Sequence, residues 1–347
     1  MVAKIATQTG LWRAAGHEVR VFAVSPPSPD SAEPQLDADV FVSTSGTSRV
    51  RELRRLGRSV DAFAPDAAYV RYDVFPPSFA RTLRRRPTAL ELNTDDLGEF
   101  RTRRSRAALV NRLLRGPTLR SAAGFVCVTN EIASSPSYTP FRKPTVVIAN
   151  GIDLHRREPL PAPRGGNGRM VFLGAPRHPW HGVDKIVALA HEMPDVAFDI
   201  VGLTPAELPG GAPAPANMTL HGRLSPTEYE PILERADVGI GSLALHRNGM
   251  TEASPLKVRE YLLYGLPVVV GYEDTDFIGD DPWFILRLPG TERNVADHVG
   301  DIRAFVENVR GRRVPHESIA ERIGAPAKEA ARLDFLDRLV QRSRRAG

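Results

Sequence analysis

Cysteine and long apolar runs are scarce in this sequence, and their scarcity limits its possible functions. Among 347 residues there is one cysteine, Cys127, so a disulfide or a cysteine-based metal site within the chain is excluded. Cys127 lies in the apolar run GFVCVT, which favours a buried core thiol over a nucleophile. No stretch approaches the roughly 18 to 20 consecutive apolar residues of a membrane span, and the first residues lack the pattern of a secretory signal. We therefore expect a cytoplasmic protein.

Lysine is rare as well. The chain has 46 basic residues but only five lysines, at positions 4, 143, 185, 257 and 328, so a lysine within a motif is informative. The formal charge of +5 favours anionic partners such as phosphates without identifying one. The basic residues are scattered and form no recognisable nucleic-acid-binding module, so we expect no nucleic-acid partner.

Stretches rich in proline and glycine divide the chain. They cover residues 25–34, 157–168 and 205–217, and the middle one separates two regions in which short apolar runs alternate with helical patterns. This predicts an α/β fold with two Rossmann-like, doubly wound domains. We expect a first domain at 1–155, a linker at 156–168, a second domain at 169–315, and C-terminal helices at 316–347 that pack back toward the first domain.

The expected strands of the second domain mostly end in glycine and lead into helices. They are 170–174, 197–202, 218–222, 238–243 and 267–272, and those of the first domain are 19–24, 40–43, 67–71, 89–93 and 124–129. The sequence SPTE predicts a capped helix start, with Ser225 as N-cap and Glu228 closing the capping box. In a doubly wound sheet, ligands bind beyond the carboxyl ends of the strands.

One segment, TEASPLKVREYLLYGLPVVVGY, combines the features of a phosphate site. Ser254 as N-cap and Pro255 at the first helical position would leave the amides of Leu256 and Lys257 facing outward at the positive end of the helix dipole. Such a helix start binds phosphate. The ammonium group of Lys257 adds a cation.

Two carboxylates flank this helix start. Glu260 lies three residues after Lys257, and Glu252 precedes the cap by two residues. This arrangement suits a nucleotide-activated sugar, with one carboxylate toward the ribose and one toward the hexose. The alternative is an ordinary amphipathic helix whose Val258, Tyr261 and Leu262 face the core while Lys257 and Glu260 form a surface pair.

These residues resemble a known family. EASPLKVRE followed by YLLYGLPVVV resembles the donor-site signature of family 4 glycosyltransferases, and GHEVRV, NTDD, TNEIA, VIANGID, FLGAPRHPWHGVDK, FDIVG and HGRLSPTEYEPILERADVGIGSL agree with that family in the same order. The resemblance implies the GT-B fold, in which two Rossmann-like domains face each other across a cleft. It also implies retaining transfer of a sugar from a nucleotide sugar, without metal or other cofactor.

The resemblance assigns roles to individual residues. Glu260 would bind the ribose and Glu252 the donor hexose, while Arg223 and Leu224 would lie beside the base. The phosphates would be held by the loop of Ser254, Pro255, Leu256 and Lys257, with Gly174 and Arg177 completing the donor site. We expect Glu252, Lys257 and His181 to be the catalytic residues. Asp274 and Asp280 begin acidic stretches in irregular sequence and are not expected to bind metal.

The phosphate clamp departs from the family pattern. Where family members often have an arginine and a lysine, this chain has Ala175 and His181. His181 could donate to phosphate in a suitable protonation state or tautomer, or it could be a helix-capping residue. Arg177 or Lys185 could supply the missing charge.

The acceptor side is less clear from the sequence. Asn93, Asp95 and Asp96 follow an expected strand and either face the cleft or form an Asx turn that caps the next helix. The acceptor would be a carbohydrate, a lipid-linked sugar or another glycoconjugate. The basic run at 101–115 could contact an anionic membrane, but its short apolar stripe, which the core can use, favours a solvated basic helix face.

Family members normally start with a buried strand and a glycine-rich loop, which are absent before the helix that precedes GHEV here. In a doubly wound sheet that strand is central, and its loss would leave backbone groups unpaired. We therefore expect either an upstream start or a compromised variant. The rival functions are a catalytically silent scaffold and a nucleotide-sugar 2-epimerase.

Overall fold

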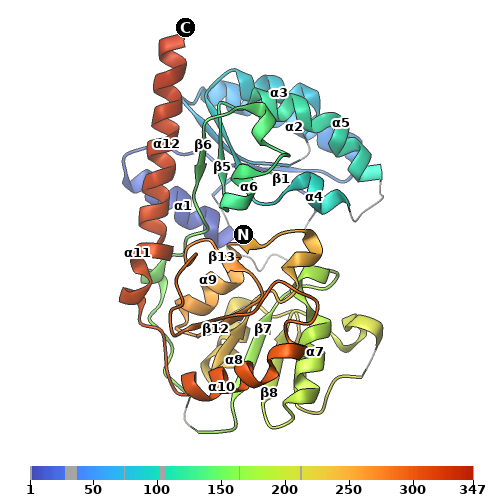
Figure 1. Ribbon diagram of the computed structural model, residues 1–347. Coiled ribbons are helices and arrows are strands. Elements are labelled where there is room, and N and C mark those ends of the chain that lie inside the picture. Colours follow the sequence, from blue (N-terminus) through green and yellow to red (C-terminus); the bar gives the residue numbers. More distant parts are fainter. Residues whose placement is uncertain are drawn as a thin grey trace. The chain divides into compact units, whose positions relative to one another are not determined.

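The chain forms two compact units in a computed structural model (Figure 1). The structure describes residues 2–27, 37–73, 75–101, 106–163, 165–211 and 213–346. The first unit comprises Met1–Gly151 together with Ala325–Gly347, and the second comprises Ile152–Gly324. The expected linker at 156–168 and the segment 316–324 therefore belong to the second unit, while the last helix belongs to the first.

The first unit has two separate parallel sheets. One is the pair β1–β2, and the other has the order β3-β4-β5-β6. The strands are β1 Phe22–Ser25, β2 Asp39–Val42, β3 Ala68–Arg71, β4 Thr88–Leu92, β5 Gly124–Cys127 and β6 Thr145–Val147. The helices are α1 Val2–Ala14, α2 Gly46–Phe63, α3 Pro77–Arg84, α4 Asp96–Arg101, α5 Arg106–Ser121, α6 Asn130–Ser134 and α12 Ala325–Ala346. The five expected strands are present, and β6 is one that the sequence analysis did not anticipate.

The core of the first unit joins its two ends. Trp12 of α1 and Phe335, Leu336 and Leu339 of α12 pack on Ala89, Val126 and Ile148 from the sheet region. Arg332 of α12 is fully buried and donates to the carbonyls of Ile148 and Ala149. The C-terminal helix is therefore an integral part of this unit.

The second unit is built on one six-stranded sheet with the order β14-β12-β10-β7-β8-β9, all parallel. Its strands are β7 Arg169–Leu173, β8 Ala197–Val201, β9 Met218–Gly222, β10 Val238–Ile240, β12 Val268–Val270 and β14 Ile285–Arg287, with the short pair β11 Glu252–Ala253 and β13 Glu273–Asp274 beside it. Its helices are α7 Val183–Glu192, α8 Pro226–Arg235, α9 Leu256–Leu263, α10 Val299–Val309 and α11 Ala320–Ile323. This is the doubly wound arrangement that the sequence predicts.

The capping box at the start of α8 is present as predicted. The backbone N–H and the hydroxyl of Ser225 both donate to the Glu228 carboxylate at 2.7 Å.

In the described part of the chain, none of the helices has the length and apolar character that crossing a membrane requires.

Candidate functional site

Glycines stand at the carboxyl edge of the large sheet. Gly174, Gly202, Gly222, Gly241 and Gly271 end or directly follow β7, β8, β9, β10 and β12. Two of them approach closely, because a Cβ at Gly202 would lie 1.8 Å from the carbonyl oxygen of Gly174. The loops after β7, β9 and β10 carry most of the predicted site residues and all leave the sheet at this edge, where open α/β sheets bind ligands.

The start of α9 differs from the prediction by one residue. Pro255 is the N-cap, with extended backbone, and the helix begins at Leu256. The hydroxyl of Ser254, the predicted cap, is buried and accepts a hydrogen bond from Arg259 at 3.0 Å. The amides of Val258 and Arg259 bond to the Pro255 carbonyl, so those of Leu256 and Lys257 precede the first intrahelical bond. These two amides therefore have no intrahelical acceptor.

The ammonium group of Lys257 is buried in an apolar setting. Its Nζ atom lies 4.2 Å from the centre of the Phe172 ring of β7 and has no hydrogen-bond partner among the described residues. Burial lowers the pKa of Lys257 to about 7. The predicted alternative, a surface pair of Lys257 with Glu260, is therefore wrong. A buried ammonium group without water or an anionic partner is unfavourable, so an anion bound beside it would stabilise its charge.

His181 packs on the same ring. Its imidazole is 5.5 Å from the Phe172 ring, and its Nδ1 atom is buried without a partner in the described structure. Burial, followed by the charges of Lys257 and His178, lowers the pKa of His181 to about 2. The side chain is consequently a neutral imidazole at physiological pH, whose single N–H can donate either to the Ala175 backbone or to a ligand but carries no positive charge.

Lys185 cannot replace the missing clamp lysine. Its ammonium group donates to the carbonyl of Thr291 at 2.6 Å and to Asn294 Oδ1 at 2.8 Å. These partners hold it inside the unit.

Arg177, in contrast, is exposed and has a left-handed backbone with φ of 63°. Arg177 and exposed Arg223 both help to lower the pKa of Glu207, after the larger effect of the hydrogen bonds from Thr204. The loops after β7 and β9 therefore bring two arginines to one region, and half-buried Leu224 follows the second of them.

Glu260 has a polar neighbourhood of its own. The Tyr229 hydroxyl donates to Glu260 Oε1 at 2.5 Å, and Arg156 Nη2 lies 3.8 Å from the same oxygen. Burial and the Glu260 charge raise the pKa of Tyr229, so the phenol stays protonated and remains a donor. Val258, Tyr261 and Leu262 are fully buried, as the sequence analysis anticipated for the core-facing side of α9.

Glu252 is held by a short β-pair. It is buried in β11, which pairs in parallel with β13. Arg259 of α9 fastens this pair: its buried guanidinium binds Asp274 through two bonds of 2.7 and 2.8 Å and Asp276 at 2.8 Å. Two carboxylates of the acidic stretch that begins at Asp274 therefore neutralise a buried arginine.

The first-unit candidates largely have local structural partners. Asp96 is buried and accepts two bonds of 2.8 Å from Arg115. Asp95 accepts from the Gly98 amide at 3.0 Å, which is the Asx cap considered above, and from Ser137 and Ser135. Burial raises the pKa of Asp95, but these hydrogen bonds outweigh it and lower the pKa overall. Asn93 differs from the two aspartates, because its buried Nδ2 atom has no hydrogen-bond partner in the described structure.

Two other predictions concern the first unit. Cys127 is buried and its pKa is raised to about 12 by burial, which confirms a core thiol. Most of the basic run at 101–115 lies outside the residues whose side chains are described, and its last arginine, Arg115, binds Asp96.

The sequence analysis did not identify the residues whose side chains contact the candidate site residues. Phe172, Tyr229 and Arg259 contact Lys257, Glu260 and Ser254, yet each stands in an unremarkable apolar or amphipathic stretch. Their roles depend on contacts between segments that are distant in the sequence, and the spacing of residues within one segment does not reveal such contacts.

Known proteins share this architecture. Residues 7–156 match the model of Glycosyltransferase Family 4, and no curated protein matches the sequence. Sucrose-phosphate synthase from Thermosynechococcus elongatus is similar with a TM-score of 0.67 at 13% identity, covering 96% of this chain and 92% of that one. HepE of Anabaena, solved with UDP and glucose, has a TM-score of 0.62 at 14% identity, covering 97% and 95%. The lipopolysaccharide outer core galactosyltransferase WaaB has a TM-score of 0.57 at 12% identity, covering 85% of this chain and 82% of that one. At such identities the structural likeness establishes the fold.

Proposed function

We propose that this chain, whose residues 7–156 match the model of Glycosyltransferase Family 4 and whose fold is that of GT-B glycosyltransferases, transfers a sugar from a nucleotide sugar to a carbohydrate or glycoconjugate acceptor. The transfer retains the anomeric configuration and needs no metal. The donor would bind to the second unit, at the carboxyl edge of its sheet.

The observation that carries this proposal is the buried ammonium group of Lys257. It lies on the Phe172 ring at the first turn of α9, beside two amides that precede the first intrahelical bond. A diphosphate placed there would supply the anion that the ammonium lacks and would accept from the amides at the positive helix end. His181, as a neutral donor, would bind a phosphate oxygen in addition.

The carboxylates fit the two sugars of the donor. Glu260, fixed by the Tyr229 hydroxyl, would accept hydrogen bonds from the ribose hydroxyls. Glu252, held by β11, would accept from the donor hexose. Arg177 and Arg223 would lie beside the diphosphate and the base.

The chemical step would break the bond between the anomeric carbon and the phosphate oxygen. Negative charge grows on that oxygen, and Lys257, His181 and the α9 amides would stabilise it. The acceptor hydroxyl would attack on the same face while its proton passes to the departing phosphate oxygen. Glu252 would position the sugar and stabilise its positive charge, without forming a covalent bond.

Binding of nucleoside diphosphates tests the donor site directly. We expect UDP, GDP or ADP to raise the melting temperature of the wild-type chain, with UDP the first choice because HepE was solved with it. Lys257→Met and Glu260→Gln should lose most of this shift, while Lys143→Met, at a half-buried lysine of the first unit that donates to the Arg120 carbonyl, should keep it. Equal shifts in the Lys257 and Lys143 variants would refute the proposed site.

A catalytically silent scaffold is the second candidate, because Ala175 and neutral His181 stand where the family often has cations. Glycosyl transfer would be measured with each binding nucleotide sugar and a panel of glycosides, with product configuration read by NMR. Binding without transfer or donor hydrolysis would favour the scaffold. Restored activity in Ala175→Arg would show which position silences it.

A further inference from the structure

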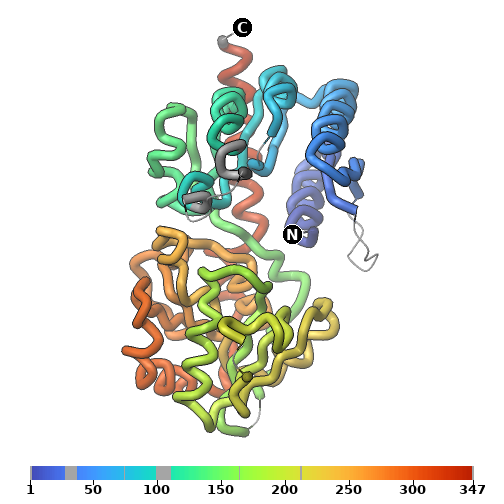
Figure 2. Tube along the Cα trace, turned by 90° about the vertical axis from the view of Figure 1, so that its right-hand side faces the viewer, coloured from blue at the N-terminus to red at the C-terminus, as the bar shows by residue number. Residues whose placement is uncertain are grey.

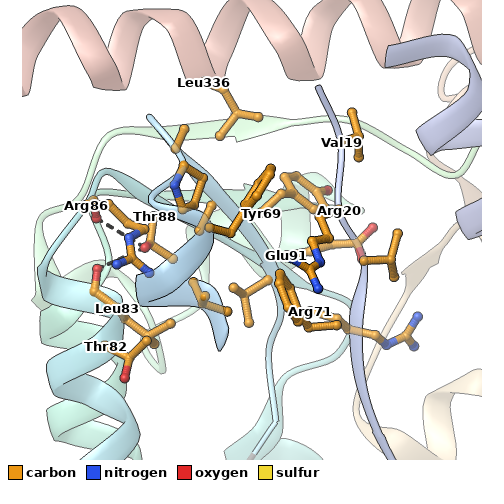
Figure 3. Close-up of a pocket in the computed structure, with 18 of the residues that line it drawn as sticks. Val19, Arg20, Tyr69, Arg71, Thr82, Leu83, Arg86, Thr88, Glu91 and Leu336 are labelled. Carbon is orange, nitrogen blue, oxygen red and sulfur yellow. Dashed lines mark hydrogen bonds between the residues drawn. The ribbon is translucent and has the colours of Figure 1, made fainter. Parts of the chain in front are cut away.

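Lys257 differs from three other lysines of the chain, whose ammonium groups all have acceptors. Lys4 of α1 binds Glu91, which lines a cavity of the first unit (Figure 3), at 2.5 Å. Lys143 donates to a backbone carbonyl at 2.9 Å, and Lys185 donates to a carbonyl and a side-chain amide. Lys257 Nζ is buried and has no hydrogen-bond partner among the described residues. Its nitrogen is therefore not committed to another group of the described chain.

The surroundings of Lys257 Nζ favour the neutral amine. Both β7 and α9 belong to the second unit, which Figure 2 shows in green, yellow and orange. Within this unit, Nζ lies 4.2 Å from the centre of the Phe172 ring, and the His181 imidazole packs on the same ring at 5.5 Å. Neither the aromatic ring nor the neutral imidazole supplies an anion. Burial without an anionic partner disfavours the charged form and lowers the pKa of Lys257 to about 7.

A neutral lysine amine is a nucleophile. At about pH 7.4 an ordinary lysine, with a pKa of about 10.4, has about one amine in a thousand uncharged, whereas roughly half or more of the Lys257 amines are uncharged. Lysines that an apolar setting keeps neutral react with carbonyl compounds to form Schiff bases. Lys257 has this setting.

Backbone donors for an anion lie on the same helical turn as the amine. The amides of Leu256 and Lys257 precede the first intrahelical bond of α9, at the positive end of the helix. His181 Nδ1 is buried without a hydrogen-bond partner in the described structure. Lys257 thus combines a nucleophilic side chain with a backbone donor. A ligand with a carbonyl group and a phosphate group a few atoms apart can engage both.

We propose that Lys257 is a site of reversible covalent modification by aldehydes that carry a phosphate group. The nitrogen lone pair attacks the carbonyl carbon, and a C=N bond replaces the C=O bond. The two hydrogens of the amine leave with the carbonyl oxygen as water, so no oxidant or reductant is needed. The phosphate group accepts hydrogen bonds from the Leu256 and Lys257 amides.

The modification blocks binding of a nucleotide sugar, a consequence that rests on the proposed function. The imine takes up the nitrogen that would pair with the diphosphate, and the phosphate of the aldehyde occupies the same backbone amides. The two ligand classes use different forms of one side chain, because the diphosphate pairs with the ammonium group and the aldehyde reacts with the amine. Release of the aldehyde by water restores the site.

Pyridoxal 5′-phosphate is the probe for this reaction. The full chain is incubated with it near neutral pH, imines are reduced with borohydride, and tryptic peptides are quantified by mass spectrometry. With only five lysines in the chain, each can be followed separately, and a modified Lys257 resists trypsin and is found in the peptide 248–259. We expect Lys257 to carry at least about tenfold more label than Lys143, because its uncharged fraction is larger.

Pyridoxal, which lacks the phosphate group, is the matched control ligand. It should label Lys257 about tenfold less at the same concentration, because it makes no hydrogen bonds to the α9 amides. Lys143→Met should label at Lys257 as the parent does, and Lys257→Met should show no gain at the remaining lysines. Label spread evenly over Lys257 and Lys143 would overturn the proposal, and equal labelling by the two aldehydes would overturn the role of the phosphate.

Competition with UDP separates this proposal from the proposed function. We expect saturating UDP to suppress labelling of Lys257 and to leave labelling of Lys143 unchanged. If UDP raises the melting temperature but Lys257 is labelled no more than Lys143, the covalent modification is wrong and the donor site stands. If Lys257 is labelled preferentially and UDP does not slow the reaction, the reactive amine stands and the proposed diphosphate position is wrong.

Discussion

At the scale of single residues, the proposed role of Lys257 predicts that binding of a nucleoside diphosphate depends on pH. Its pKa of about 7 in the unliganded chain would be raised by a bound diphosphate. Below pH 7 the ammonium group is already protonated, so affinity should be level. Above pH 7 binding must take up a proton, and the affinity for UDP should fall about tenfold per pH unit up to the pKa of the complex. Titration calorimetry between pH 6 and about 9 measures this slope.

The matched variants separate Lys257 from the rest of the chain. Lys257→Met should bind weakly with a level pH profile, and Lys143→Met should reproduce the wild-type slope. A slope that persists in Lys257→Met would assign the titration to another group.

Tyr229 is a positioning residue for Glu260. Tyr229→Phe removes the hydroxyl that donates to Oε1 at 2.5 Å and leaves the ring. We expect a weaker affinity for UDP by about 1.5 to 3 kcal/mol at most, the range for hydrogen bonds to charged groups. Affinity for inorganic pyrophosphate, which lacks a ribose, should not change. Equal losses for both ligands would point to a general disturbance of α8.

At the scale of elements, Arg259 holds α9 to the β11–β13 pair. Arg259→Met leaves the buried carboxylates of Asp274 and Asp276 without this cation. Breaking a buried ion pair from one side costs about 3 to 5 kcal/mol. Urea unfolding of the second unit should show a loss of this order, whereas Arg293→Met, at an exposed pair, should stay within about 0.5 kcal/mol of the parent.

Gly174 and Gly202, which directly follow the paired strands β7 and β8, approach so closely that no space is left for a side chain at Gly202. In Gly202→Ala the new Cβ would meet the Gly174 carbonyl in a residue with φ of 98°, and we expect a loss of about 2 to 5 kcal/mol. Gly210→Ala is the control, because φ is 73° there but the space is open, so the cost should be about 1 to 2 kcal/mol. Hydrogen exchange of β8 amides measures both, and equal losses would mean that φ alone matters.

Element patterns were readable from the sequence, whereas the partners of side chains were not. The glycine-ended strands and the Ser225 capping box follow local rules of period and capping, and both are present. The N-cap of α9 is Pro255, one residue after the predicted Ser254, whose hydroxyl accepts from Arg259 in a contact set by tertiary packing. Lys257 was singled out from the sequence, but its burial on Phe172 of a separate strand, which lowers its pKa to about 7, leaves no local signature.

At the scale of the whole molecule, every proposed donor-binding residue belongs to the second unit. We therefore expect the fragment Ile152–Gly324 to fold alone and to bind UDP within about tenfold of the full chain. Its two ends are adjacent, since Ile152 and Gly324 form a β-bridge. Calorimetry on the fragment and on its Lys257→Met variant checks this. A folded fragment without affinity would show that the first unit contributes to donor binding.

Because α12 belongs to the first unit, the two units cannot complete their folding in the order in which they are synthesised. On the ribosome, strands β1 to β6 emerge early but must wait while all of Ile152–Gly324 is synthesised before Phe335, Leu336 and Leu339 arrive. The second unit can condense during this interval, because its sequence is continuous. The first unit is thus the last to complete its core, although most of it is synthesised first.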